Sequence, residues 1–123
     1  MSETRERLSR IVRAYDGLVI RLYCFLRFQI IHQRFLDEVG QYFPVRGRVL
    51  DVGCGFGLFS LYYASILPGL SFYGVDRNAR RIRTATAVGQ KLGLDNVHYL
   101  TADVADHDFP EGFVVAYMLD IIH

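Results

Sequence analysis

The sequence predicts an α/β fold in which a parallel sheet follows an N-terminal helical segment. Short apolar runs alternate with stretches of helical spacing from residue 48 onward, and the first forty residues carry a helical pattern. Strands that alternate with helices in this way pair in parallel and are joined by right-handed crossovers. We therefore divide the chain into a helical segment, residues 1–45, and a sheet-containing domain, residues 46–123.

The helical segment contains two apolar stretches with a predicted break near Asp16 and Gly17. The second stretch, residues 18–36, is interrupted by arginines, and its longest uncharged run is the six residues from 28 to 33. A membrane-spanning helix needs about 20 mostly apolar residues, so this stretch does not span a membrane. We expect a helix packed on the domain with arginines at its edges. An interfacial amphipathic helix at a membrane surface is the alternative.

The second part of the chain supplies four predicted strands and two predicted helices. The strands are residues 48–52, 71–75, 96–100 and 112–119, and the helices are residues 57–66 and 78–92. Asn78 is a suitable N-cap, because its side-chain oxygen can accept hydrogen bonds from the first free backbone N–H groups. Gly93 is a suitable stop, because glycine readily adopts the left-handed conformation that ends helices.

Composition and charge limit the class of protein. The chain has 123 residues, with 14 basic and 13 acidic side chains, which suits one domain and gives no global argument for nucleic acid. We therefore expect no nucleic-acid partner. Cys24 and Cys54 are far apart and the histidines are scattered, so no disulfide framework or metal site is predicted. The polar N-terminus does not resemble a signal peptide, and we expect a cytoplasmic protein.

The strongest motif is a glycine-rich turn after the first predicted strand. Asp51 precedes Gly53, Gly55 and Gly57, and a predicted helix begins at once. Glycine permits a tight turn and lets the backbone lie against a ligand without a Cβ atom in the way. The helix N-terminus behind the turn offers unpaired N–H groups. The dinucleotide pattern GxGxxG fits poorly, because its sixth position would be leucine or serine.

The pattern Asp-x-Gly-x-Gly-x-Gly resembles motif I of the class I S-adenosylmethionine-dependent methyltransferases, and three further motifs follow in the family's order. Asp76 ends the second predicted strand, where one carboxylate can accept from both ribose hydroxyls. Residues 101–104 resemble the family's adenine-holding segment, and residues 117–123 resemble its motif at the end of strand four. The sequence is thus identified as a member of this family over residues 48–123.

The resemblance implies a Rossmann-like parallel sheet with the strand order 3-2-1-4, preceded by the N-terminal helices. It also implies S-adenosylmethionine as cofactor and S-adenosylhomocysteine as product. The implied cofactor-binding residues are Asp51, Gly53, Cys54, Gly55, Gly57, Asp76, Arg77, Asp103, Val104 and Asp120.

Each matched residue takes a role from the family. Residues 53–55 would lie against the methionine part of the cofactor, and Asp51 would organise the loop or reach the amino group through water. Asp76 would hold the ribose, and Arg77 would flank the adenine.

The remaining implied roles fall on the third and fourth strand ends. Asp103 would accept from the exocyclic amine of the adenine, and the Val104 backbone N–H would donate to the ring. The segment around Asp120 would face the methionine end and the incoming nucleophile. His123 is a weak candidate for a catalytic base, because the sequence shows no partner for it.

The family fold has seven strands in the order 3-2-1-4-5-7-6, and this sequence supplies four of them. Residues 113–118 would then form an unpaired apolar edge, which favours pairing or aggregation. We expect that the chain is a domain truncated after strand four. Pairing of two copies through this edge, giving a homodimer, is the alternative.

The expected function is S-adenosylmethionine-dependent methyl transfer to a small-molecule or lipid acceptor, by this chain or by a longer protein whose cofactor-binding part it forms. The lipid option, and with it a peripheral membrane contact, rests on the basic and apolar N-terminal helices. The alternative is a module that binds S-adenosylmethionine or S-adenosylhomocysteine without turnover on its own.

Overall fold

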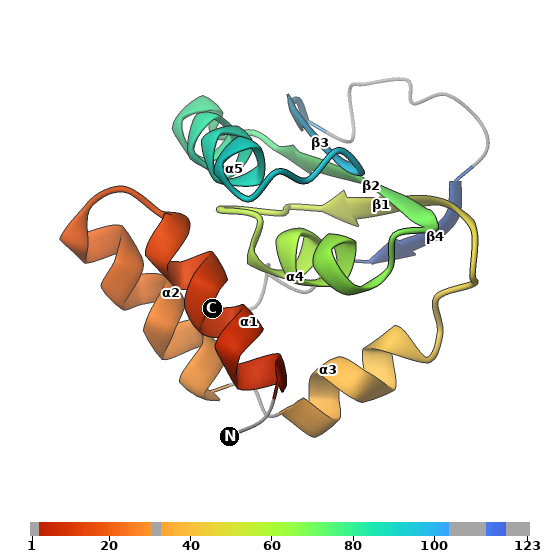
Figure 1. The fold of residues 1–123 in the computed structure, drawn as a ribbon. Helices are drawn as coiled ribbons and strands as arrows, with labels where there is room; N and C mark the ends of the chain where they lie inside the picture. The colour runs from red at the N-terminus through yellow and green to blue at the C-terminus, as the bar shows by residue number, and fades with distance from the viewer. Residues whose placement is uncertain (1–2, 31–32, 104–112, 118–123) are drawn as a thin grey trace.

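The computed structural model describes residues 3–30, 33–103 and 113–117, and confirms an α/β fold of the Rossmann-like kind (Figure 1). Three helices precede an alternation of strands and helices. The elements are α1 (Glu3–Ala14), α2 (Leu18–Ile30), α3 (Gln33–Gly40), β1 (Gly47–Val52), α4 (Leu58–Ile66), β2 (Leu70–Asp76), α5 (Ala79–Lys91), β3 (Val97–Thr101) and β4 (Phe113–Tyr117).

The four described strands form one parallel sheet in the order β3-β2-β1-β4. Asp51 of β1 lies opposite Gly74 of β2, and Gly74 lies opposite Tyr99 of β3. The register between β1 and β4 shifts between Arg48 and Val49. Because the strands are parallel, the carboxyl ends of β1, β2 and β3 meet at one edge of the sheet.

One face of the sheet packs against α4 and α5. Val49, Phe72 and Val97 lie side by side across three strands and point to the same face, since side chains alternate along a strand. The Tyr63 ring of α4 stacks on Phe72 with centroids 6.4 Å apart. Val88 of α5 is buried in the same core. Burial of these apolar side chains fixes both crossover helices on the sheet.

The predicted ends of α5 are confirmed. The Asn78 side chain accepts hydrogen bonds from the backbone N–H groups of Arg80 (3.0 Å) and Arg81 (3.2 Å). Gly93 has a φ of +70°, so the chain leaves the helix in the left-handed conformation that glycine tolerates.

Helix α1 joins the core through Ile11, and Tyr15 directly after it is also buried; α1 lies beside α4 and α5 (Figure 1). The predicted break is confirmed at Gly17, whose φ is +92°. The stretch predicted as helical over residues 18–36 contains two described helices, α2 up to Ile30 and α3 from Gln33, and residues 31–32 lie outside the described residues.

Over residues 18–26, whose side chains the structure describes, α2 packs on the domain through part of its surface. Cys24 is fully buried, whereas several large apolar side chains are between 49% and 83% exposed: Leu18, Val19, Leu22, Phe25 and Leu26. The expected packing on the domain is therefore seen for only some of the described side chains of α2. Within the described residues, no helix is long and apolar enough to cross a membrane.

Candidate cofactor site

The glycine-rich loop between β1 and α4 adopts a backbone conformation that requires glycine. Gly53, Gly55 and Gly57 have φ values of +65°, +58° and +82°, all in the left-handed region. The Gly57 N–H donates to the Cys54 carbonyl at 2.9 Å, which closes the turn immediately before α4. The alternating glycines of the motif are thus explained by backbone geometry.

Asp76, at the end of β2, holds this loop in place. Its Oδ2 accepts from the Gly55 N–H at 2.9 Å, and its Oδ1 accepts from the Asn78 N–H at 2.8 Å. The Cys54 N–H donates to the Val75 carbonyl at 3.0 Å, so the contact with β2 continues into the loop. A carboxylate offers about four acceptor positions. Asp76 is only half-buried, and acceptor positions remain for a ligand beside the loop.

Tyr99 of β3 supports the loop from within the fold, and sequence reasoning missed it. Its hydroxyl lies 2.7 Å from Ser60 Oγ and donates to the Gly57 carbonyl at 3.3 Å. The Tyr99 ring fills the space over Gly74, where an added Cβ would lie 2.6 Å from the ring. A glycine in the middle of an apolar strand was the available signal, because it leaves room for a large side chain on the neighbouring strand.

Asp51 and Cys54 lie in the interior beside Tyr99, each with about 1% of its surface exposed. Burial raises the pKa of the Tyr99 hydroxyl well above its ordinary value of 10.0, the Ser60 hydrogen bond opposes this rise, and Cys54 and Asp51 add to it. The phenol is therefore neutral and stays a hydrogen-bond donor at physiological pH. For Asp51, the predicted role at the loop remains a prediction, while the carboxylate that bonds the loop backbone at Gly55 is that of Asp76.

The N-terminal helices reach the same loop through Phe56. The Tyr15 hydroxyl donates to the Phe56 carbonyl at 2.7 Å, and the Tyr23 ring lies 5.6 Å from the Phe56 ring. The Arg81 guanidinium also lies over the Phe56 ring, 5.5 Å from its centroid. Tyr15, which directly follows α1, is a fully buried core residue, and its hydroxyl also fastens the glycine loop to the end of α1.

Arg77 and Asp103 lie together at the carboxyl edge, with Arg77 Nε 3.9 Å from Asp103 Oδ2. The Ala102 N–H donates to the Asp76 carbonyl at 3.0 Å, which keeps the end of β3 against β2. The predicted site residues that lie outside the described residues are Val104, Asp120 and His123. Among the residues that the structure describes, no group of His, Cys, Asp and Glu side chains could hold a metal ion.

The structure brings the described candidates to one edge of the sheet. A left-handed glycine loop, a half-buried carboxylate at the tip of β2 and an Arg–Asp pair at the tips of β2 and β3 adjoin there. Ligands of open parallel sheets bind at this edge, where the loop backbone and the β2 carboxylate can receive a nucleoside. The fold and this arrangement place the chain in the Rossmann-like α/β class, whose members bind nucleotide cofactors at this edge.

Comparison with known proteins identifies the family within this class. Residues 49–123 match the methyltransferase domain family, and the chain belongs to it. The tRNA (guanine-N(7)-)-methyltransferase of Synechococcus sp. strain JA-2-3B'a(2-13) is 42% identical over 72 residues, which are 58% of this chain and 28% of the relative. The ribosomal RNA small subunit methyltransferase G of Alkalilimnicola ehrlichii is 33% identical over 101 residues, which are 81% of this chain and 44% of the relative.

A solved structure agrees with this assignment. PKMT2 from Rickettsia typhi, determined in complex with AdoHcy, superimposes with a TM-score of 0.58 and 26% identity, over 63% of this chain and 15% of that one. The predicted S-adenosylmethionine-dependent methyltransferase family and its cofactor are thus confirmed. The chain spans less than half the length of the two curated relatives.

The comparisons overturn one expectation. The near-neutral net charge offers no global argument for nucleic acid, and we expected no nucleic-acid partner. Several similar proteins are nevertheless named tRNA, ribosomal RNA or RNA methyltransferases. A balanced net charge was the wrong criterion, because it averages over the surface and does not register where basic side chains gather.

Proposed function

We propose that this chain binds S-adenosylmethionine at the carboxyl edge of β1 and β2 and takes part in methyl transfer to an RNA acceptor. One observation carries the cofactor site: the Asp76 carboxylate bonds the Gly55 N–H and remains half-buried, with acceptor positions left beside the glycine loop. In this proposal Asp76 accepts from the ribose hydroxyls, and residues 53–55 with Gly57 form the backbone surface beneath the methionine part.

The neighbouring side chains complete the proposed site. Arg77 would flank the adenine and Asp103 would accept from its exocyclic amine. Their contact, 3.9 Å between Arg77 Nε and Asp103 Oδ2, supports this placement, because both side chains lie near the tips of β2 and β3. Asp51, buried at the end of β1, would support the loop from the interior. We also propose the division into a helical segment, residues 1–45, and a cofactor-binding domain, residues 46–123.

The chemistry asked of these residues is mainly positioning. When bound, S-adenosylmethionine supplies an activated methyl group. Correct placement of two reactants can by itself contribute about 7–11 kcal/mol to lowering a barrier. The loop suits this task because it is held by Asp76 of β2, Tyr99 of β3 and Tyr15 directly after α1, which all lie in regular elements or next to their ends.

The RNA acceptor is supported by the names of the relatives and by a concentration of basic side chains on one helix, described below. Calorimetric titration with S-adenosylhomocysteine tests the cofactor site, and transfer of a radiolabelled methyl group to bulk tRNA or rRNA tests the acceptor. Failure to bind S-adenosylhomocysteine would contradict the cofactor site. If S-adenosylhomocysteine binds but the methyl label is found only in small molecules or lipids, RNA is not the acceptor. If it binds and no methyl group is transferred, the result favours a cofactor-binding module that does not turn over alone.

A further inference from the structure

Helix α5 carries an exposed and strongly basic face. Its sequence, ARRIRTATAVGQK, contains four basic residues and no acidic one, and Arg77 precedes it by two positions. These five are all the basic residues of the chain after Arg48. Their side chains are exposed. The near-neutral chain therefore has a local excess of positive charge along one helix.

The placement of these charges opposes helix stability. Arg80 and Arg81 lie in the first turn of α5, which has no acidic side chain. Cations are unfavourable there, because the helix dipole places partial positive charge at the N-terminus. Arg80 and Arg83 are also three residues apart, where like charges on a helix repel. A helix shaped by stability alone would carry acids in these positions.

Two of these arginines are available to a ligand. Among the described residues, the guanidinium groups of Arg80 and Arg83 form no hydrogen bond or ion pair. Lys91, at the other end of the helix, is engaged, because its Nζ lies 2.6 Å from Asp16 Oδ1. Arg81 lies over Phe56.

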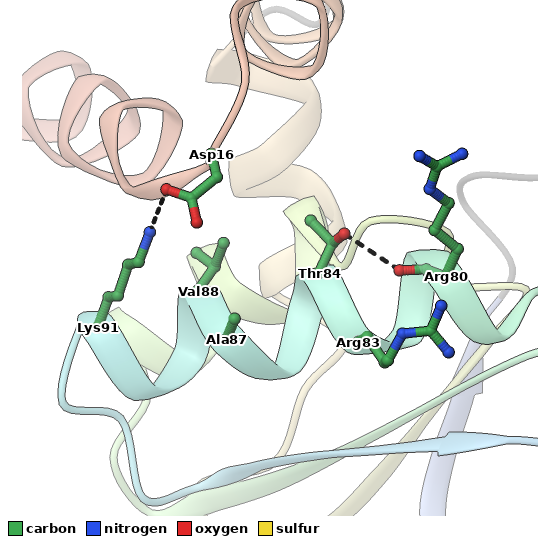
Figure 2. A pocket seen from close by; sticks show the side chains of 7 residues that line it. All are labelled: Asp16, Arg80, Arg83, Thr84, Ala87, Val88 and Lys91. Carbon is green, nitrogen blue, oxygen red and sulfur yellow. Dashed lines mark hydrogen bonds and ion pairs between the residues drawn. The ribbon is translucent and has the colours of Figure 1, made fainter.

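The two free arginines border a groove between α5 and the turn that joins α1 to α2 (Figure 2). The groove has a volume of about 290 Å³. Thr84, Ala87 and Val88 line it between its ends, and the Lys91–Asp16 pair lies at one end. Arg80 and Arg83 stand at the other end. Exposed guanidinium groups beside a groove suit a sugar–phosphate chain, because Arg can donate two parallel bonds to a phosphate.

The basic face leads to the proposed methyl-transfer site. Helix α5 begins three residues after Asp76, at the carboxyl edge of the sheet, and runs back toward the opposite edge. Its first turn thus adjoins the glycine loop, as the contact of Arg81 with Phe56 shows. A polyanion lying along α5 would have one end beside the cofactor site.

We propose that the α5 basic groove, bordered by Arg80 and Arg83, binds the sugar–phosphate backbone of the RNA acceptor next to the nucleotide that is methylated. This inference rests on the proposed function and deepens it, since it assigns the surface through which the RNA is held. Contacts of this kind position a nucleic acid and carry no base specificity.

The test compares two variants with the same change of charge. The first is Arg80→Glu with Arg83→Glu on α5. The matched control is Arg10→Glu with Arg13→Glu on α1, an exposed pair with the same three-residue spacing. Binding of a fluorescein-labelled single-stranded RNA is followed by anisotropy from roughly 50 to 200 mM salt, the range over which phosphate contacts change affinity strongly. Calorimetry with S-adenosylhomocysteine is run on each protein.

The α5 variant is expected to bind RNA at least about tenfold more weakly at low salt. Its slope of log K against log salt is expected to fall by about 1.4, because each phosphate contact contributes about 0.7 in single strands. The control should keep most of its affinity, and S-adenosylhomocysteine should bind both variants as it binds the wild type. Acids in the first turn favour the helix, so the melting temperature of the α5 variant should stay equal or rise.

Three outcomes overturn the inference. Equal weakening in both variants would show general charge attraction, and an unchanged salt slope in the α5 variant would place the RNA elsewhere. Tighter binding of a polyglutamate peptide than of RNA to the wild type would indicate an acidic protein partner. If the Glu variant loses its far-ultraviolet circular dichroism, Arg80→Gln with Arg83→Gln removes the charge without reversing it. If the wild type does not bind S-adenosylhomocysteine, the proposed function is contradicted instead, whatever the RNA result.

Discussion

Substitution of Asp76 by alanine tests the centre of the proposed site, because one carboxylate is assigned two tasks. It accepts from the Gly55 N–H at 2.9 Å and from the Asn78 N–H at 2.8 Å, and it is proposed to accept from the ribose. Asp76→Ala removes all of these bonds. The effect of this substitution on the free energy of unfolding and its effect on ligand affinity can be measured separately.

The magnitudes follow from the surroundings of each donor. Gly55 is buried, so its N–H would lose its acceptor away from water, which costs about 1–3 kcal/mol. Asn78 is exposed, and water can replace the carboxylate there. We therefore expect a loss of about 1–3 kcal/mol in the free energy of unfolding. A charge-assisted bond to a ribose hydroxyl contributes about 1.5–3 kcal/mol to binding. Its loss should raise the Kd for S-adenosylhomocysteine roughly 10- to 150-fold.

Urea denaturation and calorimetry measure the two effects, with Asp95→Ala as the matched control. Asp95 is exposed and lies between α5 and β3, at the opposite edge of the sheet from the glycine loop. Its replacement should change neither quantity. An Asp76→Ala variant with unchanged Kd would falsify the ribose assignment. An unchanged free energy of unfolding would show that the bond to Gly55 has no net value in the free protein.

Three further outcomes are expected. Tyr99→Phe removes the hydroxyl bonded to Ser60 and should lower the free energy of unfolding by about 0.5–1.5 kcal/mol in urea denaturation; equal stability would mean that this bond contributes nothing net. Gly57→Ala combines a φ of +82° with a Cβ only 2.5 Å from the Tyr99 hydroxyl and should destabilise the fold by about 2–4 kcal/mol, whereas an unchanged melting temperature would contradict the described loop. Lys91 lowers the pKa of Asp16 from 3.8 through a hydrogen bond and its charge, so the stability gained from this pair is present above pH 3.8 and is lost as pH falls through the lowered pKa. Lys91→Met should return the Asp16 pKa to about 3.8 in a carboxyl NMR titration, and no rise would refute the pairing.

Elements governed by local chemistry could be predicted from the sequence. Asn78 caps α5, and Gly93 follows its end, because capping depends on side chains within a few residues of the helix terminus. The wide exposure of the described apolar side chains of α2 was not predicted. An apolar stripe shows which side chains favour burial, but what packs against them depends on the whole fold.

In the site, too, features set by adjacent residues could be predicted, whereas contacts between residues far apart in the sequence could not. The glycine loop was predictable because its three left-handed residues are adjacent in the chain. The bond from Tyr99 to the Gly57 carbonyl joins residues 42 positions apart, and it follows from strand pairing rather than from any motif. The family pattern placed Asp76 at the ribose, yet its bond to Gly55 depends on how the loop folds back over β2.

Charge was the least reliable sequence criterion. The totals of 14 basic and 13 acidic residues led to the exclusion of nucleic acid, although every basic residue after position 48 lies between Arg77 and Lys91. Spacing within that stretch would have been informative, because a helix with four basic residues and no acid is unusual for a stable solvent-exposed helix.

The three attachments of the glycine loop have a consequence for the N-terminal helices. Asp76 and Tyr99 hold the loop from the sheet, and Tyr15, directly after α1, holds it from the other side through the Phe56 carbonyl. A loop fixed at three points loses little conformational freedom when a ligand binds. If one attachment is removed, part of the binding free energy is spent on reordering the loop. Changes in α1 can therefore weaken cofactor binding without touching the cofactor. For the same reason, substitutions of these three residues should not be additive, since each acts on the position of one shared loop. The helical segment is thus part of the proposed cofactor site, although its residues carry none of the family motifs.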